Sequence, residues 1–95
     1  MNTIKFNETT FPVESYNRNT YLSDGHIHGD GNCTVVANNL GTLTDLMDDT
    51  ITVIQIYHDN ELIYTADNLN ANISSINEYL SDDRINISLN LRFDN

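Results

Sequence analysis

The sequence predicts a mainly β domain of the α+β class: an antiparallel β-sandwich or barrel of about 6–7 strands with one short helix near residues 40–48. Three observations predict it: alternating apolar and polar residues near the C-terminus, turn residues between β-prone segments, and leucines at helical spacing in one place. With 95 residues, the chain is expected to form a single domain, residues 1–95.

The C-terminal segment has the clearest pattern. Apolar residues occupy every second position from Ile85 to Phe93, which indicates a strand with one face in the core. Residues 72–80 predict a preceding strand, and residues 81–84 (Ser-Asp-Asp-Arg) supply the turn between the two. A C-terminal hairpin is therefore expected.

The middle of the chain predicts a second hairpin. Residues 51–57 (ITVIQIY) are rich in β-branched residues and apolar on both faces, which is typical of a central strand. Asp59 and Asn60 form a turn signal, after which residues 62–64 (Leu-Ile-Tyr) predict the returning strand.

The N-terminal part predicts two strands, residues 3–6 and 10–15, around a turn at Asn7-Glu8. Residues 17–22 are expected to continue the second strand past a bulge near Tyr16, because the inward-facing parity shifts there.

Asp24-Gly25 is a strong turn signal, and it precedes a strand expected over residues 26–37. Gly29 and Gly31 lie within this strand and predict a break or bulge. The odd positions Ile27, Cys33, Val35 and Ala37 are expected to face the core, and the even positions to face solvent.

One segment predicts a helix, because its apolar residues share one helical face. These residues are Leu40, Leu43, Leu46 and Met47. Thr42 and Asp45 have the spacing of a capping box, and the helix is expected to cover one face or opening of the sheet. No internal repeat, linker or low-complexity tract is found.

Charge limits the partners that the chain can attract. Four Lys and Arg stand against fourteen Asp and Glu, a formal net charge of −10. This field repels nucleic-acid phosphates and anionic membranes and favours cationic partners. Six of the acids fall at expected turns or at the helix end, where Asp is favoured for its local hydrogen bonds: Asp24, Asp48, Asp49, Asp59, Asp82 and Asp83.

The N-terminus lacks the features of a signal peptide, and no apolar run has the length of a membrane span. We therefore expect a soluble protein of the bacterial cytoplasm or a virion. The single cysteine rules out an intramolecular disulfide.

Residues 26–33 contain the candidate metal ligands. On a regular strand His26, His28 and Asp30 share one face, and two imidazoles with a carboxylate suit a divalent transition metal. The alternative, which we favour, is that these side chains point to solvent and Cys33 is a small buried hydrophobe. No cofactor is expected.

Residues 30–33 (Asp-Gly-Asn-Cys) resemble the nucleophile segment of ovarian-tumour family cysteine proteases. The resemblance implies a catalytic thiolate at a helix start, but here Thr34-Val35-Val36 favours a strand. His58 is the only histidine that follows Cys33, and a catalytic set would need a histidine within hydrogen-bond reach. We therefore expect no catalytic residues and no enzymatic activity.

The candidate interface residues are two tyrosines at strand positions, which are able to anchor contacts, and two turn acids. They are Tyr57, Tyr64, Asp82 and Asp83. The four basic residues are scattered along the sequence, so direct nucleic-acid binding is not expected.

These observations favour a non-enzymatic structural, assembly or protein-interaction module, forming a homo-oligomer or contacting virion neighbours. At the level of architecture the predicted layout resembles small bacteriophage tail and head–tail proteins. The alternative is an acidic phage-encoded inhibitor, similar to anti-CRISPR proteins, that mimics nucleic acid and binds a basic protein surface.

Overall fold

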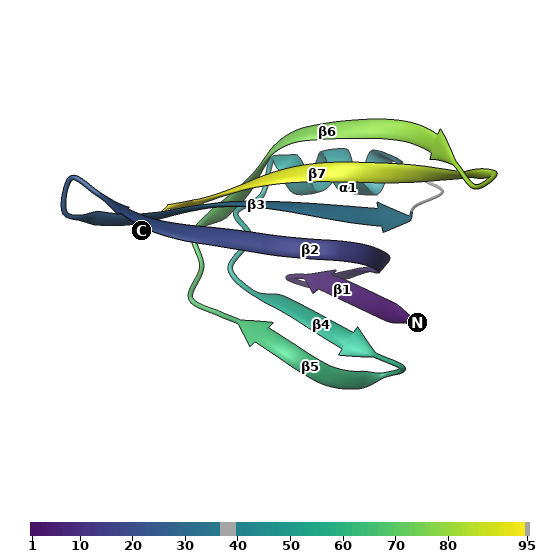
Figure 1. The fold of residues 1–95 in the computed structure, drawn as a ribbon, viewed down its shortest axis with the longest axis horizontal. Helices are drawn as coiled ribbons and strands as arrows, with labels where there is room; N and C mark the ends of the chain where they lie inside the picture. Colours follow the sequence, from purple (N-terminus) through teal and green to yellow (C-terminus); the bar gives the residue numbers. More distant parts are fainter. Residues whose placement is uncertain (37–39, 95) are drawn as a thin grey trace.

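The structure is a computed structural model that describes residues 1–36 and 40–94. In the described residues it contains seven strands and one helix (Figure 1). The elements, in chain order, are β1 (Asn2–Phe6), β2 (Thr9–Ser23), β3 (His26–Val36), α1 (Leu40–Met47), β4 (Ile54–His58), β5 (Glu61–Ala66), β6 (Ala71–Ser81) and β7 (Arg84–Asp94). The predicted mainly β class with one short helix is confirmed.

The strands form one antiparallel sheet in the order β5-β4-β1-β2-β3-β7-β6. β2 joins two halves of this sheet: residues 9–12 pair with β1, and residues 13–23 pair with β3. The register shifts between Val13 and Ser15, close to the bulge predicted near Tyr16. Because a bulge bends a strand, the sheet folds over at β2 into the two layers seen in Figure 1. The result is sandwich-like, with β5 and β6 as its edge strands.

The core lies between the two layers and draws on both halves of the sheet and on α1. Its fully buried side chains of largest volume come from β1, α1, the segment before β4, β4 itself, β3 and β7. They are Phe6, Ile4, Leu43, Ile51, Ile54, Ile87, Leu89, Val35 and Cys33. Each such side chain contributes about 1.5–3 kcal/mol relative to an exposed one, so this cluster dominates the stability.

Three predicted two-residue turns are confirmed at Asp24-Gly25, Asp59-Asn60 and Asp82-Asp83. Both residues of each turn have positive φ, between 49° and 78°. This is the type I′ backbone, whose twist matches that of paired strands, and Asn, Asp and Gly tolerate it best. Four of these six turn residues are acidic, so part of the acidity is explained by turn geometry.

The predicted break in β3 is wrong. β3 keeps a continuous register with β7 from His28 to Val36 and with β2 from His26 to Thr34. Gly29 and Gly31 are needed for space instead: a Cβ on Gly31 would lie 2.7 Å from the carbonyl oxygen of Asn17 and 3.1 Å from the Phe93 ring. The Phe93 ring therefore occupies the room that two missing side chains leave on the inner face.

The predicted alternation of buried and exposed side chains in β3 is confirmed in the middle of the sheet and is wrong at the start of the strand. Cys33 and Val35 are buried as predicted, whereas Ile27 is exposed. The reason is that the β2–β3 hairpin extends beyond the layered part of the sheet (Figure 1), where no second layer covers it. Ala37 lies outside the described residues.

β7 and β4 also differ in detail from the predicted strands. Ile85 is exposed and Asn86 is buried, and the Asn86 amide donates hydrogen bonds to the backbone oxygens of Ser81 and Arg84 beside the turn. β4 begins at Ile54 rather than at residue 51, because Ile51 forms an isolated bridge with Ala71 on another part of the sheet.

α1 packs beside β6 and buries Leu43 and Leu46, as predicted, while Met47 is exposed. The helix begins at Leu40, so Thr42 lies inside it and is not its N-cap. Within residues 1–36 and 40–94, no helix has the length and apolar character required to cross a bilayer.

Candidate interaction surfaces

The candidate metal ligands share one face of β3 but do not form a ligand set. The rings of His26 and His28 lie 6.4 Å apart between centroids, and His28 Nδ1 lies 3.6 Å from an Asp94 carboxylate oxygen. Among the described residues, no group of three or more His, Cys, Asp or Glu side chains is arranged to hold a metal ion. The His28 ring instead packs beside Tyr21, its partner in the strand ladder, with centroids 5.9 Å apart.

Cys33 is a core residue. It is fully buried in the middle of β3, not at the start of a helix as the protease resemblance implies. Burial raises the pKa of its thiol to about 12, so the thiol is protonated at neutral pH. A nucleophilic cysteine needs the thiolate form, and this environment opposes it.

The four candidate interface residues do not lie together. Tyr64 is exposed on edge strand β5, and Tyr57 is half-buried on β4 with its hydroxyl donating to Gln55 Oε1 at 3.3 Å. Asp82 and Asp83 form the exposed turn between β6 and β7, at the other edge of the sheet. The structure therefore separates them into two different surfaces.

The first surface is the β5 patch, which we define as Leu62, Ile63 and Tyr64. All three side chains are exposed, although they are consecutive residues of one strand. Every residue from Glu61 to Thr65 is exposed, so both faces of this edge strand are open to solvent. Ile63 is the extra residue of a bulge, since Tyr64 pairs with Ile56 and Leu62 with Tyr57. Sequence reasoning found Tyr64 but missed its two neighbours, whose signal was an apolar triplet directly after a turn.

The β5 patch adjoins a shallow pocket of about 190 Å³ at the bend in β2. The Tyr16 ring lies beside the Tyr64 ring, with centroids 5.8 Å apart, and its buried hydroxyl has no hydrogen-bond partner among the described residues. Burial and the neighbouring Tyr64 raise the pKa of Tyr16, so its phenol stays neutral. Asn2, Val13, Glu14, Ser15 and Ile56 line the rest of the pocket.

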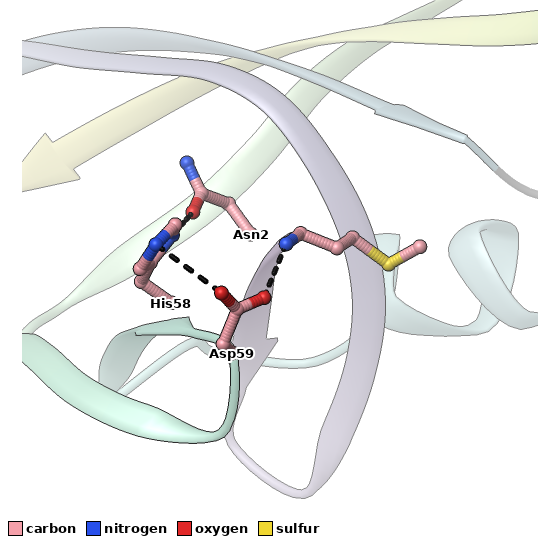
Figure 2. A network of polar contacts seen from close by, with 4 residues as sticks. Asn2, His58 and Asp59 are labelled. Carbon is pink, nitrogen blue, oxygen red and sulfur yellow. Dashed lines mark hydrogen bonds and ion pairs between the residues drawn. The ribbon is translucent and has the colours of Figure 1, made fainter.

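A polar network fixes the turn at the start of β5 (Figure 2). The amino group of Met1 donates to Asp59 Oδ1 at 2.5 Å, and His58 Nε2 lies 3.4 Å from Asp59 Oδ2. His58 Nδ1 is 2.7 Å from Asn2 Oδ1, which joins this turn to β1. The hydrogen bond and charge of the Met1 amino group, with a smaller effect of His58, lower the pKa of Asp59.

The second kind of surface is a hairpin end, and it occurs twice, at β2–β3 and at β6–β7. Each exposes a tyrosine, a leucine and an isoleucine beside its turn. The residues are Tyr21, Leu22 and Ile27 in one hairpin and Tyr79, Leu80 and Ile85 in the other. Sequence reasoning missed this surface because it placed Ile27 and Ile85 in the core.

Comparison with known proteins finds no matching family model, no matching curated protein and no matching solved structure.

Proposed function

We propose that this chain is a non-enzymatic protein-interaction module of the structural or assembly kind, and that its β5 patch contacts the β5 patch of a second copy. The single observation that carries the proposal is the β5 patch itself. It places three consecutive apolar side chains in solvent on a strand whose outer edge has no partner among the described residues. Such an edge is a template for pairing with another strand.

Local charge is compatible with self-association, although the whole chain is strongly acidic. Glu61 is the only charged residue in β5, and Asp24, Asp59 and Asp82 lie at turns. In an antiparallel two-fold pairing with Ile63 opposite Tyr64, Glu61 lies opposite Ala66 of the other copy. Like charges then do not face each other, and the apolar side chains meet at the centre.

The contact is expected to give a closed dimer rather than a fibre. Growth beyond a dimer would have to use the other edge strand, β6, which carries a bulge at Ser74. Bulges interrupt the ladder and twist an edge away from continuous pairing. A two-fold contact through β5 uses the same surface on both copies and is complete after one pairing.

A bacteriophage virion component is the setting we propose for such a module. Its support is a β-rich layout with one helix and a surface dominated by Asn, Thr, Ser and Asp, with only four Lys and Arg. The acidic-inhibitor alternative finds weaker support. Four of the acids have positive φ and form turns, so they do not make a continuous acidic stripe that would resemble a nucleic-acid backbone: Asp24, Asp59, Asp82 and Asp83.

The test is the oligomeric state of the purified chain by light scattering coupled to gel filtration. The wild type is expected at twice its mass of 10.8 kDa, and the variant Leu62→Thr/Ile63→Thr at the monomer mass. Asn72→Thr/Asn77→Thr, on the exposed face of the other edge strand, is the matched control and should stay dimeric. A wild type that is monomeric at millimolar concentration refutes the β5 contact.

A further inference from the structure

The β2–β3 and β6–β7 hairpins carry the same sequence motif, Tyr-Leu-Ser-Asp-X-X-Ile. We call residues 21–27 the first tip and residues 79–85 the second tip. The prediction of no internal repeat is wrong for these two short segments, in which five of seven positions are identical. The repeat gains meaning from the structure, which places both copies at the same position in a hairpin.

The two tips match in cross-strand pairing and in side-chain exposure, although Arg84 of the second tip also forms an ion pair with Glu14 of β2. Leu22 pairs with Ile27 across the first hairpin, and Leu80 pairs with Ile85 across the second. The exposed fractions agree side chain by side chain: 43% and 40% for the tyrosines, 72% and 72% for the leucines, 49% and 44% for the isoleucines. Each tip therefore exposes the same three side chains: a tyrosine, a leucine and an isoleucine.

Turn formation alone does not require these exposed apolar side chains. The type I′ turn depends on its two central residues, Asp-Gly in the first tip and Asp-Asp in the second. The leucine and isoleucine lie outside those positions, and their exposure gives up the stabilisation that burial would provide. These side chains are therefore available for contact with something outside the chain.

The tips point in opposite directions. In Figure 1 the β2–β3 turn lies at one end of the longest axis and the β6–β7 turn at the other. The extent of the molecule along that axis is 45 Å. One rigid domain thus carries two copies of one binding element at opposite ends.

We propose that the two tips dock into two copies of one partner site, an apolar pocket rimmed by Lys or Arg, so that this chain bridges neighbouring subunits of a repetitive partner protein. The apolar part follows from the exposed leucine and isoleucine. The basic rim follows from the shared motif aspartate, Asp24 or Asp82, which forms no ion pair with any described residue. The proposal adds a second partner to the proposed function and does not depend on the β5 contact.

A second copy of this chain is the poorer occupant. Two convex tips touching each other bury far less than the roughly 1,200–2,000 Å² of a stable interface. Their aspartates would also meet at close range and repel. A concave pocket avoids both problems, and two weak contacts joined by a rigid domain bind far more tightly than one.

The test places a photo-reactive benzoylphenylalanine at Leu22 or at Leu80 of the whole chain, expressed in its source cells and irradiated there. Both positions are expected to cross-link to the same peptide of the same partner protein. The control position, Asn72 on exposed β6, should give no such adduct. Adducts to different proteins, or no adduct at either tip, overturn the proposal.

Substitutions then test bivalency with the purified cross-linked partner. Leu22→Thr and Leu80→Thr keep strand propensity and are each expected to weaken binding on the order of 100-fold, because one engagement is lost. Loss of affinity from only one of the two variants contradicts the equivalence of the tips. Binding of the wild type to phosphatidylcholine vesicles, abolished by the same variants, would assign the tips to membranes and overturn the proposal.

The Leu62→Thr/Ile63→Thr variant separates this proposal from the β5 contact. A monomeric variant that still gives both tip adducts supports both proposals. A monomeric wild type with tip adducts supports the tip proposal and refutes the β5 contact. A dimeric wild type without adducts supports the β5 contact and refutes the tip proposal.

Discussion

Replacing Gly31 by alanine tests how β3 fits into the sandwich. The added Cβ would lie 2.7 Å from the Asn17 carbonyl oxygen and 3.1 Å from Cε2 of Phe93. The first of these neighbours is backbone in the adjacent strand β2, so relief requires a movement of the strand and not of a flexible side chain.

The cost follows from this overpacking. Inserting a methyl group into a well-packed site costs about 1–3 kcal/mol. Alanine recovers about 0.4–1 kcal/mol by restricting the unfolded chain. The two ranges combine to a net loss of about 0–2.6 kcal/mol. Because the closest contact, 2.7 Å, is with backbone, we expect the upper part of this range, about 1–2.5 kcal/mol, which in a domain of this size lowers the Tm by roughly 4–20 °C.

Urea denaturation and thermal melting measure this loss. Asp30→Ala, at the exposed neighbouring position on the other face of β3, is the control and should change stability by about 0.5 kcal/mol or less. Adding Phe93→Leu should not rescue Gly31→Ala, because the carbonyl contact persists. A Gly31→Ala protein as stable as the wild type would show that β3 does not pack as described.

Three further predictions concern other parts of the fold. Asn7→Ala should cost about 2–3 kcal/mol in urea denaturation, because the Asn7 side chain bonds Thr50, Thr52 and Val53 and its φ is 55°; Asn7→Gly keeps the backbone freedom and should cost less. Cys33 should resist Ellman's reagent at pH 8 in the native protein and react fully in guanidinium, since burial raises its pKa to about 12; native labelling would contradict that burial. Asp59 has a lowered pKa in the folded protein, so its contribution to stability is present above its ordinary pKa and is lost as pH falls through the lowered value. Asp59→Asn should therefore destabilise at pH 7, and its difference in stability from the wild type should shrink as the pH falls below the ordinary pKa of aspartate; a difference that does not change with pH would count against the pairing with Met1.

Local patterns were sufficient for most strands and turns. Alternation from Ile85 to Phe93 predicted β7, and Asp-Gly, Asp-Asn and Asp-Asp pairs predicted the turns, because strand period and positive φ are properties of neighbouring residues. The acidity at these turns was predictable for the same reason.

Contacts between distant segments were not predictable in this way. Parity placed Ile27 and Ile85 in the core, but burial requires a second layer, and only the bend of the sheet at β2 determines where that layer ends. Gly31 was predicted to interrupt a strand, whereas the Asn17 carbonyl oxygen in β2 and the Phe93 ring in β7 explain why it is glycine, and both lie on other strands.

The sequence by itself determined that this is an acidic, mainly β chain with two-residue turn signals between its strands and a single cysteine, because each of these depends on composition or on adjacent residues. The tertiary structure alone decided which apolar side chains remain outside. It exposed the β5 patch and aligned residues 21–27 with residues 79–85 as matching tips at opposite ends of the molecule. The physical reason is that exposure depends on which elements pack together, and packing joins residues that are far apart along the chain.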